Sequence, residues 1–147
     1  MSHSLSKQVV VVSGAGRGLG AAIAAAFARE GAQVVVNYRA SRAQAEALAA
    51  TLGPRTVALQ ADVRDASQVG AMFDTIERTM GPVTTVVHNA LADYRFNGDA
   101  RDTIATLTPD KLLEQTNTAC VGALTLLQRA VPAMAQAVLV CSSSLSG

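Results

Sequence analysis

The chain has 147 residues, of which 50% are hydrophobic and 16% are charged, and its formal net charge is +1. This size allows one globular core, so we expect a single domain over residues 1–147. The near balance of charges gives no electrostatic reason to bind nucleic acid or a membrane surface, and no apolar run is long enough to span a bilayer.

Two further absences narrow the class of protein. The N-terminal segment lacks the apolar stretch of a secretory signal, which favours a cytoplasmic protein. The two cysteines, Cys120 and Cys141, stand alone in the sequence, which argues against a disulfide framework and a paired-cysteine metal site. We expect both to be small buried hydrophobic residues and expect no metal centre.

Apolar runs of strand length alternate along the chain with segments of helical period. The nearly continuous valine runs are typical of parallel strands buried on both faces, and each segment between them is long enough for a right-handed crossover. The sequence therefore predicts an α/β fold with a doubly wound parallel sheet. The strands are expected at residues 9–13, 33–37, 56–60, 83–88 and 138–141, and the helices at 18–30, 42–52, 66–80 and 110–136.

The first predicted strand runs into a glycine-rich turn that opens the first predicted helix. Glycines allow a tight turn and let the backbone approach a phosphate group without a Cβ atom in the way. The start of the helix adds unpaired N–H groups and the positive end of its dipole. The context of strand, turn, helix and second strand favours a dinucleotide site in a Rossmann-type sheet over a purely structural turn. The residues expected to bind the cofactor here are Gly14, Arg17, Gly18, Leu19 and Gly20.

From Ser13 the turn has the spacing Ser-Gly-x-x-x-Gly-x-Gly. This spacing resembles the short-chain dehydrogenase/reductase family more than the Gly-x-Gly-x-x-Gly pattern of the long-chain dehydrogenases. The resemblance covers essentially the whole chain and is nearest to the 3-oxoacyl-(acyl carrier protein) reductase branch. It implies an oxidoreductase that transfers a hydride between a nicotinamide cofactor and a carbonyl or alcohol substrate, with a 3-oxoacyl thioester as one candidate.

The end of the second predicted strand bears on the choice of cofactor. Relatives specific for NAD usually carry an acidic residue there to accept the ribose hydroxyls. Here Tyr38 takes that place and Arg39 follows it. A guanidinium can pair bidentately with a 2′-phosphate, and Arg17 and Arg42 could assist, so the resemblance implies NADP(H), with NAD(H) as the alternative. The competing interpretation is that these arginines are solvated surface groups.

The resemblance assigns further cofactor contacts to the next two strand ends. Asp62 and Val63 match the pair that binds the adenine ring through a carboxylate and a backbone N–H group. Asn89 and Ala90 match the centre of the Asn-Asn-Ala-Gly motif that lines the ribose, whereas Leu91 replaces its glycine. We expect His88, which precedes them, to be a satisfied strand-end histidine.

Two residues are candidates for the chemistry. Asn117 matches the asparagine that helps to bind a water molecule in the family's proton relay. Ser144 lies three residues before Gly147, the spacing of the family's catalytic serine, although Ser142 and Ser143 remain alternatives. The polar segment 93–102 is either a loop near a substrate pocket or an interface, or a plain surface loop.

The family's tyrosine and lysine have no counterpart in this sequence. The tyrosines are Tyr38 and Tyr94 and the lysines are Lys7 and Lys111, and no Tyr-x-x-x-Lys pair occurs. We therefore expect the sheet to be truncated after the fifth strand and the chain alone to be inactive. The alternatives are a dinucleotide-binding or sensing module without catalysis and an inert fragment. By resemblance alone, the partners are a small carbonyl, alcohol or acyl thioester substrate and further copies of the chain. Relatives commonly associate through the fourth helix and the one after it, which implies a homodimer or homotetramer.

Overall fold

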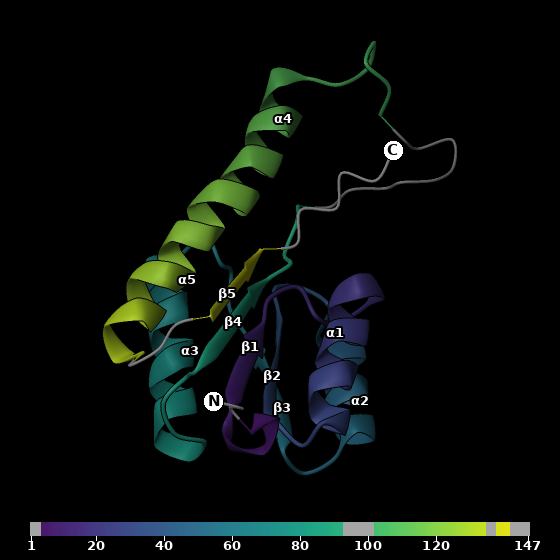
Figure 1. Ribbon diagram of the computed structural model, residues 1–147. Helices are drawn as coiled ribbons and strands as arrows, with labels where there is room; N and C mark the ends of the chain where they lie inside the picture. The colour runs from purple at the N-terminus through teal and green to yellow at the C-terminus, as the bar shows by residue number, and fades with distance from the viewer. Residues whose placement is uncertain (1–3, 93–101, 135–137, 142–147) are drawn as a thin grey trace.

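The computed structural model describes residues 4–92, 102–134 and 138–141. Five parallel strands form one sheet in the order β3-β2-β1-β4-β5, which confirms the predicted α/β fold. Helices cover both faces, α1 and α2 on one and α3 and α5 on the other, while α4 extends beyond the end of the sheet (Figure 1). The strands are β1 (Val9–Val12), β2 (Gln33–Tyr38), β3 (Thr56–Gln60), β4 (Thr85–His88) and β5 (Val138–Cys141). The α-helices are α1 (Gly18–Arg29), α2 (Arg42–Leu52), α3 (Ala66–Thr79), α4 (Pro109–Thr116) and α5 (Gly122–Ala130).

The valine runs fill two separate cores, one on each side of the sheet. Along β1, Val9 and Val11 pack with Phe73, Ile76 and Leu126 beneath α3 and α5. The alternate valines of β1 join β2 and α1 in the second core, whose members include Val10, Val12, Val34, Val36 and Ala24. A strand with a core on each side has no solvent face, so its sequence is apolar at every position instead of alternating.

The fourth strand begins two residues later than the sequence predicts. The Thr84 hydroxyl accepts a hydrogen bond from the Val9 N–H at 3.0 Å and lies 3.2 Å from the Val9 carbonyl. The Thr84 N–H also donates to the Val9 carbonyl at 3.0 Å, so Thr84 contacts β1 through both its backbone and its side chain just before the strand begins. Val83 is still buried, which explains why hydropathy alone extended the strand to it.

The single helix predicted over residues 110–136 is wrong in its continuity. α4 passes into a π-helical turn at Asn117–Val121, then into α5, and a 3-10 turn at Val131–Ala133 ends the segment. Pro132 has no N–H group to donate to a carbonyl one turn earlier, so the α-helix stops just before it. None of the helices in the described part of the chain is long and apolar enough to cross a membrane.

Candidate dinucleotide site

The residues predicted to bind a cofactor gather at the carboxyl end of the sheet. β1 lies between β2 and β4, and the helices that follow β1 and β4 cover opposite faces (Figure 1). In a doubly wound sheet, this reversal opens a crevice beyond the strand ends. The crevice has a volume of about 710 Å³. All the predicted cofactor residues except Gly20 line it, namely Gly14, Arg17, Gly18, Leu19, Tyr38, Arg39, Asp62, Val63, Asn89 and Ala90.

The glycine-rich turn closes tightly against the end of β4. Gly14 has a φ of +63° and a Cβ atom there would lie 2.8 Å from the Ala90 Cα. Gly20 lies behind the crevice wall, where a Cβ atom would come within 2.5 Å of the Asn89 Nδ2. Both glycines thus let two backbone segments meet closely. Gly18 has a φ of +59° and opens α1, no side chain caps this helix, and its first residues, Gly18 and Leu19, line the crevice.

Ser13 holds the two halves of the crevice together, a role that the sequence analysis did not assign. Its buried Oγ accepts hydrogen bonds from the Asn89 N–H at 3.0 Å and the Ala90 N–H at 3.1 Å. The Asn89 side-chain amide in turn donates to the Gly14 carbonyl at 3.2 Å. The only signal in the sequence was the Ser at the head of the glycine motif, because the partners lie about 75 residues away.

The end of β2 presents an aromatic residue and an arginine to the crevice. Tyr38 is buried, whereas Arg39, just beyond the strand, is exposed. The buried Asn37 amide donates to the carbonyls of Leu59 and Ala61, which fixes the end of β2 against the end of β3. Arg42, which was expected to assist, lies outside the crevice lining and forms an exposed ion pair with Glu46 at 3.6 Å.

Asp62 is held by Arg64, a crevice residue that the sequence analysis missed. The Arg64 Nε and Nη2 donate to the two carboxylate oxygens at 2.9 and 2.7 Å. The hydrogen bonds from Arg64 outweigh burial and lower the pKa of Asp62, so the carboxylate is charged at neutral pH. Helix α3 is capped instead by Asp65, whose carboxylate accepts from the N–H groups of Ser67 and Gln68. Asp62 is therefore not needed as a cap.

The end of β4 connects to the π-helical turn through His88. Its ring nitrogens lie 3.1 Å from the Ser13 Oγ and 3.1 Å from the Ala119 carbonyl. This confirms the prediction of a satisfied strand-end histidine. Desolvation by burial lowers the pKa of His88, opposed in part by the carbonyls of Ala119 and Thr118, so the ring is neutral at pH 7.

Of the two predicted catalytic residues, Asn117 lies in the described part of the chain and Ser144 does not. Asn117 begins the π-helical turn with an exposed side chain, and its neighbour Thr118 is the residue of that turn that lines the crevice. Ser144 lies outside the described residues, as does most of the polar segment 93–102. β5 ends at Cys141, in register with His88, and therefore at the same edge of the sheet as the crevice. Leu91 lines the crevice and is partly exposed.

Two other expectations concern cysteine and metal. Cys120 is exposed, so the prediction of a small buried hydrophobic residue is wrong for it. The cause is local, since Cys120 lies on the solvent side of the π-helical turn, whose register the sequence did not reveal. Within the described ranges, no three His, Cys, Asp or Glu side chains lie close enough together to hold a metal ion.

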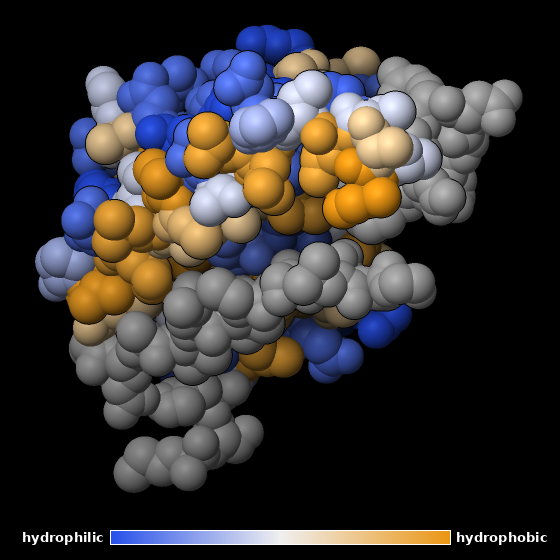
Figure 2. All heavy atoms as spheres, turned by 90° about the horizontal axis from the view of Figure 1, so that it is seen from above, coloured by the Kyte–Doolittle hydropathy of each residue, from blue (hydrophilic) through white to orange (hydrophobic). Residues whose placement is uncertain are grey.

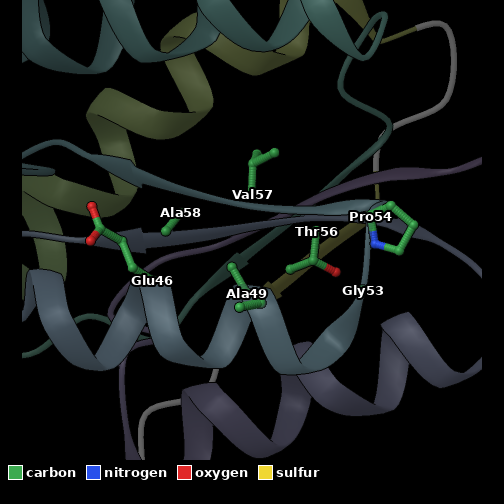
Figure 3. A pocket seen from close by; sticks show the side chains of 8 residues that line it. Glu46, Ala49, Gly53, Pro54, Thr56, Val57 and Ala58 are labelled. Atoms are coloured by element: carbon green, nitrogen blue, oxygen red, sulfur yellow. The ribbon is translucent and has the colours of Figure 1, made fainter.

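A second hollow lies far from these residues, between α2 and the edge strand β3 (Figure 3). It has a volume of about 480 Å³, and the close-up shows Ala49 of α2 beside Thr56 and Ala58 of β3. Glu46 is the one ionisable side chain among the residues that line it. It is an open groove at the sheet edge without a cluster of reactive groups, so the crevice remains the candidate site.

Comparison with known proteins gives a consistent result. Residues 14–147 match a family described as enoyl-(acyl carrier protein) reductase. Over 91 residues the chain is 45% identical to the short chain dehydrogenase/reductase AacuN of Aspergillus aculeatus, a match that covers 60% of this chain and 34% of that protein. It is 37% identical over 99 residues to an NADPH-dependent aldehyde reductase-like chloroplastic protein of Arabidopsis thaliana, covering 58% and 37%.

Among solved structures, the fold is similar to a 3-ketoacyl-(acyl-carrier-protein) reductase from Brucella melitensis complexed with NADH. The TM-score is 0.78 at 26% identity, and the match covers 88% of this chain and 51% of the other. The chain therefore spans about a third of the curated relatives and about half of this structure.

Proposed function

The chain belongs to the short-chain dehydrogenase/reductase family, and from this premise we propose that it binds NADP(H) for hydride transfer to or from a carbonyl or alcohol carbon. The observation that carries the proposal is the crevice at the strand reversal, where Ser13 and Gly14 close against the backbone of Asn89 and Ala90. When bound, the nicotinamide supplies or accepts the hydride. The residues of this chain bind and orient the cofactor.

Each part of the crevice suits one part of a dinucleotide. The uncapped start of α1 offers N–H groups and a positive dipole to the pyrophosphate, beside Arg17 and Leu19. The charged Asp62 can accept a hydrogen bond from the adenine amino group while Arg64 holds it in place, and Val63 lies beside it in the crevice lining. Asn89 and Ala90 lie against the glycine-rich turn and also line the crevice, where a ribose would pack.

The preference for NADP(H) is proposed from the chemistry at the end of β2. Tyr38 ends the strand and Arg39 follows at the crevice edge, so a 2′-phosphate would meet a guanidinium, with no carboxylate at the strand end to repel it. The relatives leave the choice open, because one is named as NADPH-dependent and the solved structure contains NADH.

The variant Arg39→Asp tests this preference. We expect it to weaken NADPH binding by about tenfold or more, through loss of an ion pair and gain of repulsion, and to change NADH binding little. Arg42→Asp is the matched control, since Arg42 lies outside the crevice. Cofactor fluorescence titration measures both. Equal losses of NADPH and NADH affinity in Arg39→Asp would overturn the role of Arg39.

The chemistry is proposed to involve Ser144, which would polarise the substrate oxygen, and Asn117, which would support a proton relay. A 3-oxoacyl thioester is the first substrate to test, in view of the acyl carrier protein reductases that the chain resembles. In the complete protein, we expect NADPH oxidation with this substrate and its loss in Ser144→Ala. Tight cofactor binding without turnover of any carbonyl substrate would favour the alternative, a dinucleotide-binding module without catalysis.

Assembly is proposed to use the exposed side of α4 and α5. Hydrophobic side chains gather in a band along these helices when the molecule is seen from above (Figure 2). The exposed hydrophobic residues of α4, the π-helical turn and α5 include Leu112, Leu113, Val121 and Leu124, which are 40–57% exposed. Exposed apolar surface of this kind favours association of copies into a dimer or tetramer. Sedimentation should show an oligomer that Leu113→Glu with Leu124→Glu dissociates, and an unchanged mass would contradict this interface.

A reducing compartment such as the cytoplasm is proposed as the site of action. Cys120 is an exposed free thiol, and such a group survives best where thiols are kept reduced. Labelling of Cys120 in freshly lysed cells with a thiol reagent tests this, and a blocked thiol would argue against it.

A further inference from the structure

His88 stands at the junction between the crevice and the long helical segment behind it. It is the last residue of β4, is 6% exposed, and has a hydrogen-bond partner for each ring nitrogen. One partner, the Ser13 Oγ, belongs to the glycine-rich turn. The other, the Ala119 carbonyl, belongs to the π-helical turn at Asn117–Val121.

The hydrogen bonds around Ser13 determine which nitrogen of His88 carries the proton. The Ser13 Oγ already accepts from two backbone N–H groups, those of Asn89 and Ala90. A hydroxyl has two lone pairs and one proton, so the remaining interaction with the ring must use the serine proton. Ser13 therefore donates to Nδ1, and the ring proton lies on Nε2, where it is donated to the Ala119 carbonyl.

The helical segment packs closely against the sheet near the hydrogen bond between His88 Nε2 and the Ala119 carbonyl. A Cβ atom at Gly122 would lie 2.7 Å from the Val63 Cγ2 and 3.1 Å from the His88 Cε1. The helical segment thus packs closely against Val63 and His88 at the glycine that follows the π-helical turn. The same turn places Thr118 in the crevice lining.

We propose that His88 is a positioning residue that couples the crevice to the π-helical turn. The chain of hydrogen bonds runs from the backbone N–H groups of Asn89 and Ala90 through Ser13 and the Nε2–H tautomer of His88 to the Ala119 carbonyl. It fixes the distance between the residues that close the crevice and the turn that carries Thr118. A change at Asn89 and Ala90 is therefore expected to alter the π-helical turn, and a change in the turn to alter the crevice.

The tautomer can be measured directly, without any cofactor. The chain has two histidines, so the variant His3→Gln assigns the imidazole nitrogen resonances of His88 in the ¹⁵N-labelled complete protein. We expect an unprotonated Nδ1 and a protonated Nε2 at neutral pH. A protonated Nδ1, or a doubly protonated ring, would overturn the assigned hydrogen-bond chain.

The coupling is tested by His88→Phe and its conservative counterpart His88→Gln. Phenylalanine fills the space but has no hydrogen-bonding atoms, whereas the glutamine amide keeps a donor for the Ala119 carbonyl. In His88→Phe, we expect amide hydrogen exchange over residues 117–124 to rise about tenfold and NADPH binding to weaken severalfold, and His88→Gln to restore most of both. Unchanged exchange in a folded His88→Phe protein, or failure of glutamine to restore it, would contradict the proposal.

NADPH binding rests on the proposed function, whereas the His88 tautomer and the amide hydrogen exchange do not. Failure of the proposed function can therefore be distinguished from failure of the role proposed for His88. If the wild-type protein binds no NADPH, the proposed function fails, while the tautomer and the hydrogen exchange still test the role of His88. If His88→Phe does not fold, the decision falls to the tautomer in the wild-type protein and to hydrogen exchange in His88→Gln. Exchange in His88→Gln close to the wild-type rate supports the link, and a rise of about tenfold overturns it.

Discussion

Gly14 and Ala90 meet so closely that a Cβ atom at position 14 would lie 2.8 Å from the Ala90 Cα. Each residue lies two positions beyond the end of its strand, Gly14 after β1 and Ala90 after β4, and these two strands are adjacent in the sheet. Their contact brings the glycine-rich turn and the end of β4 together as two walls of one crevice. A backbone atom cannot move aside as a flexible side chain can, so the site depends on the absence of a side chain at residue 14.

The first prediction concerns that contact. Gly14→Ala places a side chain both at a φ of +63° and against backbone. We expect a loss of about 2–4 kcal/mol in the free energy of unfolding and a loss of NADPH binding. Gly53→Ala is the control, since it has a φ of +101° but nothing within 4 Å of its Cβ atom, and it should cost only about 1–2 kcal/mol and leave binding intact. Denaturant unfolding and cofactor titration measure both. Equal effects of the two substitutions would show that the contact with Ala90 is unimportant.

The second prediction concerns the attachment of α5 to α3. The Arg129 guanidinium donates to Glu77 at 2.9 and 3.0 Å and to Asp74 at 2.8 Å, and it lies 5.4 Å from the centre of the Phe73 ring. Arg129→Gln should lower the free energy of unfolding by about 1–2 kcal/mol, and Arg129→Lys by less. Arg42→Gln, which breaks the exposed pair with Glu46, should cost less than about 0.5 kcal/mol. If Arg129→Gln lowered the free energy of unfolding as little as Arg42→Gln, the proposed attachment of α5 to α3 through Arg129 would be contradicted.

The third prediction concerns two buried threonines in the sheet. In the described part of the chain, the Thr56 hydroxyl is buried and has no hydrogen-bond partner, whereas the Thr85 hydroxyl donates to the Gln8 Oε1 at 2.7 Å. Removing a hydroxyl without a partner relieves a desolvation cost, so Thr56→Val should raise the free energy of unfolding by about 1 kcal/mol. Thr85→Val should lower it by about the same amount. Thermal unfolding of the two variants would refute this account if both shifted in the same direction.

The fourth prediction concerns pH. Burial lowers the pKa of His88 below its ordinary value of 6.5, so on acidification the unfolded chain takes up this proton at a higher pH than the folded chain does. The contribution of His88 to the free energy of unfolding should therefore be constant well above pH 6.5 and fall as the pH decreases from there toward the lowered value. The groups facing the ring are the Ser13 hydroxyl and the carbonyls of Thr118 and Ala119.

His88→Gln provides the comparison for this prediction, because glutamine does not titrate. The difference in unfolding free energy between the wild-type protein and this variant should narrow as the pH falls through that window. Denaturant unfolding at a series of pH values measures the difference. A difference that stays constant with pH would show that His88 titrates alike in the folded and unfolded chains.

The fold was predictable because its signals are local. The valine runs and the glycine-rich turn each depend on a few neighbouring residues, which a pattern in the sequence can show. The crevice followed from these elements, since parallel strands bring their carboxyl ends to one edge. Most of the cofactor residues assigned from sequence therefore line one cavity.

What was missed depends on contacts between distant residues. The hydropathy of residues 110–136 has the period of a helix, but it does not reveal a π-helical turn, which is a change in hydrogen-bond register. Consequently the side chain of Asn117 is exposed and Thr118 faces the crevice. Ser13 is hydrogen-bonded to residues just after β4, and His88 to Ala119. These pairs are 31 to 77 positions apart in the sequence, so no local sequence pattern could predict them.

The central claim is that the crevice binds a nicotinamide dinucleotide, and a fluorescence titration of the purified protein with NADPH tests it most directly. We predict saturable binding of one NADPH per chain that NADP⁺ displaces and Gly14→Ala abolishes, while Gly53→Ala leaves it unchanged. The absence of saturable binding, or binding that Gly14→Ala does not weaken, would contradict the claim.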